Sequence, residues 1–180
     1  MAKTKRNSHS SYDPAAIETG LGPLGLLPSF EISADTKDKL KKLERFSLER
    51  EIRVLSKDEN FTLDDRGIPT LAREFKRFMS LGLLFPKPKY NFAPSKPVDR
   101  MWHELILDTR RYDAMCMEVH GAFVHHNPLD PEQIAENAGE VIRYTKECIG
   151  TAYGATVPWI WGGKMAICYY TSGCDQLACW

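Results

Sequence analysis

Hydrophobic residues recur at helical spacing along most of the chain. Residues 35–55 carry leucines and isoleucines three or four positions apart, among many charged residues, with a slip in the pattern near residues 46–47. A second helix is expected to begin near Pro69, because proline suits the first helical turn, and to end at Gly82. The first half of the chain therefore predicts amphipathic helices that share one core.

The second half predicts three more helices. The third covers about residues 97–107, and Thr109 is placed to cap a fourth helix that ends at Gly121. A capping-box pattern at its start and a glycine at its end predict a fifth helix over residues 131–150. After this point the pattern fails, and short strands or loops packed on the helices are expected.

The two ends differ from this helical part. Residues 1–13 are polar and predict a disordered tail, whereas residues 14–34 mix apolar side chains with glycine and proline and predict an irregular arm on the core. Residues 151–180 form an aromatic, cysteine-containing segment. The sequence thus predicts an all-α fold: a single domain of about five helices over residues 35–150, flanked by these segments.

Composition and charge narrow the classes of function. The formal net charge is +0, so no overall field attracts nucleic acid, and the basic stretch Arg73–Lys89 is better explained as a solvated helix face plus linker. No apolar run approaches the roughly 20 residues of a membrane span. The basic start is not followed by the apolar stretch of a secretory signal, so a cytoplasmic location is expected.

Five cysteines with irregular spacing are expected to be reduced thiols or ligands rather than a disulfide framework. Four of them follow residue 147: Cys148, Cys168, Cys174 and Cys179. They contain no CxxC pair, so a zinc-ribbon pattern is missing, and small hydrophobic thiols are the simpler interpretation.

The segment Val98–Pro128 holds four of the five histidines and is the strongest lead to a function. Asp99 and His103 are four residues apart on the predicted third helix, so their side chains project from one flank. A carboxylate that holds one imidazole nitrogen leaves the other nitrogen for a metal or a proton. We therefore take His103 and Asp99 as candidate catalytic residues; the alternative is a helix-start carboxylate beside a hydrogen-bonded core histidine.

Further candidate metal ligands lie on the following helix and link. Cys116 and His120 are also spaced by four residues, although a buried cysteine and a helix-ending histidine explain them equally well. His125 and His126 follow in an extended link, where successive side chains point to opposite sides, so one of them could face back onto the helices. His103, His125, His126 and Cys116 are thus the candidate ligands, with zinc or iron as the expected ion.

The motif Pro97-Val98-Asp99-Arg100-Met101-Trp102-His103 resembles the core of the glycine-rich-domain-protein-like (DUF1399-type) family. The other residues that carry the resemblance, which covers roughly residues 60–130, are Thr109, Tyr112, Cys116, Gly121 and the His125-His126 pair before Pro128. The sequence departs from the family's VDxxWHxH pattern at Leu105, and His125 or His126 is the natural replacement for that histidine. The resemblance implies a helical domain and no particular activity.

Two functions remain open from the sequence. The first is a metal-binding protein with a site centred on His103, with metal-dependent catalysis of an unspecified substrate if it is an enzyme. The second is a non-catalytic interaction or structural module, in which Trp102 and His103 tie two helices together. In that case the apolar ends would bind a protein partner or a second copy of the chain. Converging histidine nitrogens around an open site would favour the first function.

Overall fold

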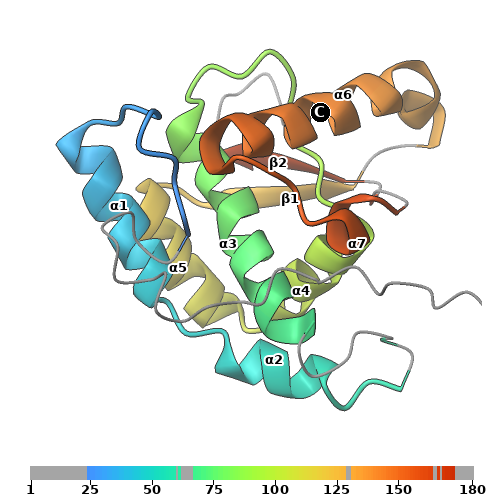
Figure 1. Ribbon diagram of the computed structural model, residues 1–180. Helices are drawn as coiled ribbons and strands as arrows, with labels where there is room; N and C mark the ends of the chain where they lie inside the picture. Colours follow the sequence, from blue (N-terminus) through green and yellow to red (C-terminus); the bar gives the residue numbers. More distant parts are fainter. Residues whose placement is uncertain are drawn as a thin grey trace, which may run out of the picture.

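The computed structural model describes residues 24–59, 61, 67–128, 131–163, 166 and 168–172 (Figure 1). Within these residues the elements are α1 (Ala34–Arg45), α2 (Glu49–Leu55), α3 (Gly67–Leu84), α4 (Lys96–Ile106), α5 (Thr109–His120), β1 (Val124–Pro128), α6 (Pro131–Tyr153), α7 (Pro158–Trp161) and β2 (Cys168–Ser172). The fold class is all-α, as predicted, with one antiparallel ribbon formed by β1 and β2.

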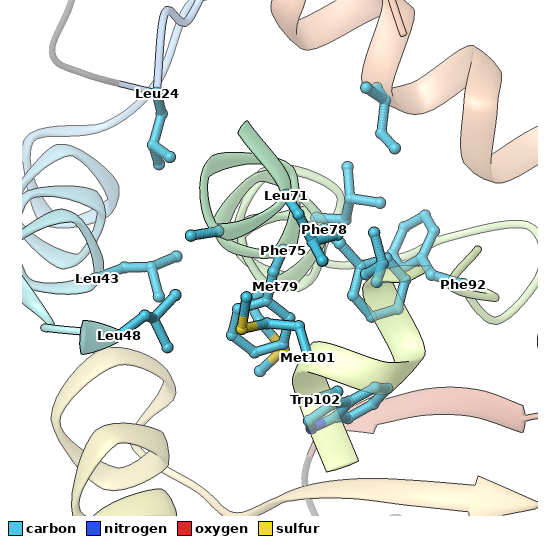
Figure 2. Close-up of a cluster of buried hydrophobic side chains, with 14 of the residues drawn as sticks. Leu24, Leu43, Leu48, Leu71, Phe75, Phe78, Met79, Phe92, Met101 and Trp102 are labelled. Atoms are coloured by element: carbon cyan, nitrogen blue, oxygen red, sulfur yellow. The ribbon is translucent and has the colours of Figure 1, made fainter. Parts of the chain in front are cut away.

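Helix α3 is the centre of the fold, and α1, α2, α4 and α6 contact it (Figure 1). Its side chains are buried on most sides, which is typical of a helix enclosed by others rather than lying on a surface. Figure 2 shows Phe75, Phe78 and Met79 of α3 among side chains from the surrounding elements. Phe78 also meets the ring of Trp102 edge to face, with centroids 5.5 Å apart, which couples the core to α4.

The first amphipathic segment forms two helices. Ser33 caps α1 by accepting a hydrogen bond from the Thr36 N–H, and α1 ends at Phe46, whose backbone is extended. The slip near residues 46–47 is therefore a break between α1 and α2. It lets Leu43 and Leu48, which straddle it, both face the core (Figure 2).

Three predicted helix boundaries were wrong. Asp108 caps α5, one residue before Thr109, because its carboxylate accepts from the Arg111 N–H. Gly82 and Gly150 lie within α3 and α6 rather than at their ends. Glycine is tolerated inside a helix whose neighbours are well packed, so the residue type alone did not fix these ends.

The connections around α4 and α5 decide where the histidines go. Ser95 caps α4, with Pro97 in its first turn, and α5 follows after a short turn, so the two helices contact each other. Gly121 ends α5 with a φ of 74°, a left-handed conformation that glycine adopts without strain. The chain then enters β1 beside α4.

The terminal segments are described in part. Residues 24–33 form no long helix and lie on the core, where the Arg77 side chain donates to the Leu24 carbonyl at 2.7 Å and the Leu27 N–H donates to the Ala152 carbonyl at 2.8 Å. Residues 1–23, Cys174 and Cys179 fall outside the described residues, so the disordered tail, the binding of a partner by the apolar ends and a C-terminal cysteine site stay predictions.

Arg77 corrects the interpretation of the basic stretch. We expected it on a solvated face of the second helix, but it is buried against Glu74 and the ring of Tyr153. Its neighbour Lys76 donates to the backbone carbonyl of Glu44. In the part of the chain that the structure describes, no helix has the length and apolar character needed to cross a lipid bilayer.

Candidate metal centre

Three ligand-type side chains meet where β1 crosses α4. His126 Nε2 lies 2.7 Å from Asp99 Oδ1 and 3.0 Å from His103 Nε2, and the third side of the triangle, from His103 Nε2 to Asp99 Oδ1, is 3.7 Å. Among the described residues, these three side chains form a group that could hold a metal ion. Asp99, His103 and His126 are called the Asp-His-His triad below.

The size of this triangle suits a metal ion. A circle through the three atoms has a radius of about 1.9 Å, slightly less than the about 2.0–2.2 Å at which imidazole nitrogen and carboxylate oxygen bind zinc. An ion placed a little above the plane of the three atoms would therefore be at ligand distance from all of them. The three ligands would occupy one side of the ion.

Protons alone satisfy the triad poorly. A neutral imidazole nitrogen carries either one N–H or one lone pair, directed along a single line in the ring plane. His126 Nε2 lies within hydrogen-bond distance of both the Asp99 carboxylate and His103 Nε2. A single proton on His126 Nε2 can therefore form a well-directed hydrogen bond to only one of these two partners. A cation above the three atoms would interact with all three at once.

The triad lies at the surface with a partly buried base. The side chains of Asp99 and His126 are 18% and 15% exposed, whereas that of His103 is 48% exposed. Asp99 also lies in the first turn of α4, where the helix dipole stabilises a carboxylate. Two anchored ligands and one more accessible ligand leave a side from which water or a small molecule can approach.

Strand alternation decides which histidine of the adjacent pair joins the triad. Val124 is fully buried, so its side of β1 faces the helices, and His126 lies two residues later on the same side. The ring of His126 meets that of Trp102 edge to face, with centroids 4.6 Å apart. His125 points the other way, and its ring packs against Phe123 with centroids 5.0 Å apart.

The structure does not bring His125 or Cys116 into the triad, although both were candidate ligands. Cys116 is completely buried in the apolar side of α5, and desolvation raises the pKa of its thiol, which disfavours the thiolate that binds metal. His120 also stays apart: burial, with a smaller contribution from Lys39, lowers its pKa to about 4. His120 is therefore a neutral, partly buried histidine rather than a charged helix cap.

The comparisons with known proteins concern the family. A family model described as UCP032817-like matches residues 38–149, a region that contains α4, α5, β1 and the whole triad. The comparison with curated proteins gives no match. The comparison with solved structures gives no match either.

The resemblance to the glycine-rich-domain-protein-like (DUF1399-type) family was therefore wrong, since the family model that matches is a different one. The most specific part of that resemblance was the short motif around Trp102 and His103, and the departure at Leu105 already lay within this motif.

Proposed function

The chain belongs to the UCP032817-like family, and we propose that it is a metal-binding protein whose Asp-His-His triad holds a divalent ion. The observation that carries the proposal is the convergence of three ligand atoms, with separations of 2.7, 3.0 and 3.7 Å, on a point that all three can reach at ligand distance.

The ligand set favours zinc or iron(II). Two imidazoles and one carboxylate are one of the common ligand sets of catalytic zinc sites, and they are the facial triad of non-haem iron(II) sites. Structural zinc sites usually have four protein ligands, whereas this group offers three and is exposed beside His103. An ion bound here would act as a Lewis acid toward a water or substrate oxygen on its open side. The substrate is not specified by the triad.

A second candidate function is a structural clamp between α4 and β1. The 2.7 Å contact between Asp99 and His126 and the packing of His126 on Trp102 favour it, because both join the strand to the helix without an ion. The two functions differ in what they require of His103. A clamp gains little from this half-exposed side chain, whereas a metal site needs it as a ligand.

The test is the metal content of the purified, untagged protein, measured by elemental analysis after dialysis against zinc and, anaerobically, against iron(II). We expect one ion per chain in the wild type and a loss of at least about 100-fold in affinity in Asp99→Ala, His103→Ala and His126→Ala, because each loses a ligand. His125→Ala is the matched control, since His125 neighbours His126 on the strand but faces away.

Two results would overturn the metal site. One is a wild-type protein that binds no ion at micromolar concentration. The other is binding that His103→Ala leaves unchanged while Asp99→Ala and His126→Ala merely lose stability, which would support the clamp. Equal loss in His125→Ala would show that the bound ion lies elsewhere.

A further inference from the structure

We infer that the Tyr112 hydroxyl is the positioning group of the Asp-His-His triad: it joins the helix that carries Asp99 and His103 to the strand that carries His126. The inference rests on the proposed metal site and adds a residue that does not touch the ion. Tyr112 lies on α5, which supplies none of the three ligands, so its role is to hold α4 and β1 in place.

Besides a contact with the Cys116 thiol on its own helix, the hydroxyl of Tyr112 makes hydrogen bonds to the two neighbouring elements, in opposite roles. It accepts from the Trp102 indole N–H at 2.9 Å and donates to the Val124 carbonyl oxygen at 2.6 Å. Trp102, Tyr112 and Val124 are each at most 1% exposed, so water does not replace either bond. One oxygen atom therefore links α4, α5 and β1 inside the core.

The two hydrogen-bond partners of the Tyr112 hydroxyl, Trp102 and Val124, lie one to three residues from the proposed ligands in the sequence. Trp102 immediately precedes His103 and follows Asp99 by three residues, so fixing the indole fixes the part of α4 that carries both ligands. Val124 is two residues before His126 on the same face of β1. The helix and the strand also meet directly, because the His126 ring packs on the Trp102 ring with centroids 4.6 Å apart.

Metal affinity is sensitive to this kind of support because ligand distances are tolerated only within about 0.2 Å. Removing the hydroxyl would break the link between the Trp102 N–H and the Val124 carbonyl, so that β1 could shift relative to α4. Outer groups that orient metal ligands typically change affinity about 10–100-fold when they are removed. We expect Tyr112→Phe to fall in this range while the three ligands remain present.

Tyr153→Phe is the matched control for loss of a buried tyrosine hydroxyl. The Tyr153 hydroxyl lies 2.6 Å from Ser80 Oγ, and the residue is buried, but its partners are on α3 rather than on α4 or β1. Both variants remove one oxygen atom from the core and are expected to lower stability. They should differ in the readouts that report on the triad.

The experiment compares wild type, Tyr112→Phe and Tyr153→Phe by zinc titration in competition with a chromogenic chelator and by the visible spectrum of the cobalt(II)-loaded proteins. We expect Tyr112→Phe to bind zinc about 10–100-fold more weakly and to change the cobalt spectrum, and Tyr153→Phe to match the wild type in both. Circular dichroism confirms that each variant is folded at the temperature of titration.

Zinc binding by Tyr112→Phe at wild-type affinity, with an unchanged cobalt spectrum, would overturn the positioning role and leave the metal site standing. A wild-type protein that binds neither ion would overturn the proposed function itself. If Tyr112→Phe does not fold, Trp102→Phe serves, since it keeps a ring beside His126 and removes the indole donor. The same loss of affinity is then expected, and wild-type affinity would contradict the inference.

Discussion

Two polar clusters in this molecule each combine a carboxylate with nitrogen-bearing side chains, and they differ in how fully those groups satisfy one another. In the first, Glu74 is completely buried and receives one hydrogen bond on each oxygen, from Arg77 and from the Trp161 indole, both at 2.9 Å. In the second, the Asp-His-His triad, Asp99 Oδ1 and two imidazole nitrogens face one another at the surface.

Under the proposed function, this difference distinguishes a structural cluster from a candidate metal site. Around Glu74, Arg77 and the Trp161 indole donate to the carboxylate, and Arg77 also donates to the Leu24 carbonyl. These hydrogen bonds join the residues before α1, helix α3 and helix α7 without any bound ion. In the triad, His126 Nε2 faces both Asp99 and His103, and one proton on this nitrogen can be directed well at only one of them. Both oxygens of Glu74 thus have their own donors, whereas the proposed cation would be a partner shared by all three groups of the triad.

The comparison predicts the largest effect for Glu74→Ala. It leaves the Arg77 guanidinium and the Trp161 N–H buried without their acceptor, and we expect the free energy of unfolding to fall by about 3–5 kcal/mol. Asp35→Ala is the control: its contact with Lys39 is as short, 2.8 Å, but exposed, and is worth about 0.5 kcal/mol. Urea denaturation measures both, and similar losses would contradict the structural role of the Glu74 cluster.

The next prediction concerns His120, a histidine outside both clusters that stays neutral without a metal ion. The pKa of His120 is lowered to about 4, mainly by desolvation, so the unfolded chain binds a proton below about pH 6.5 while the folded chain does not until about pH 4. The free energy of unfolding should therefore fall as the pH decreases through this window, by roughly 3 kcal/mol in all. His120→Gln should flatten this part of the profile, and an unchanged acid limb in urea denaturation would refute the assignment.

If the triad binds zinc, the free energy of unfolding should depend on the zinc concentration. Zinc at 100 times its dissociation constant should raise the free energy of unfolding of the wild type by about 2.7 kcal/mol. His103→Ala without zinc should match the zinc-free wild type, since its side chain is half-exposed. At the same zinc concentration it should gain at most about 0.4 kcal/mol, because its affinity is expected to be at least about 100-fold weaker. Thermal unfolding with and without zinc measures this, and an equal gain in both proteins would place the ion elsewhere.

The last prediction concerns Glu44, beside the Glu74 cluster, whose effect opposes that of His120 and so leaves the smallest net change with pH. Desolvation raises its pKa to about 7, against the opposing influence of Lys76 and a backbone hydrogen bond from Leu24. The folded chain thus binds a proton that the unfolded chain releases above about pH 4.5, so this group's contribution lowers the free energy of unfolding as the pH rises from 4.5 to 7.

This slope is opposite in sign to that of His120 and similar in size, because the two pKa shifts are about equal, so the two contributions oppose each other where their pH windows overlap. The difference in unfolding free energy between wild type and Glu44→Gln should therefore change with pH over this window. A difference that is constant between pH 4.5 and 7 would show that Glu44 titrates normally.

Periodicity was sufficient to predict the helical class and to place Asp99 and His103 on one flank of a helix, because both depend on spacing within one helix. The expected hydrogen bond between these two side chains was wrong: His103 Nε2 lies 3.7 Å from Asp99 Oδ1, and His126 Nε2 takes the close position at 2.7 Å. It could not choose between His125 and His126, since the choice depends on which face of β1 packs on α4. The burial of Val124 and the Trp102 contact decide it. Cys116 looked like a ligand by the same spacing rule, but that rule does not distinguish a site from an apolar helix face.

The most direct measurement is a crystal structure of the zinc-loaded protein with anomalous data collected on both sides of the zinc absorption edge. The account predicts one anomalous peak within about 2.0–2.2 Å of Asp99 Oδ1, His103 Nε2 and His126 Nε2. The exposed side of the ion would face solvent. A structure from zinc-saturated crystals with no peak at these atoms, and with the Asp99–His126 contact unchanged, would contradict the metal site and leave the triad a helix–strand clamp.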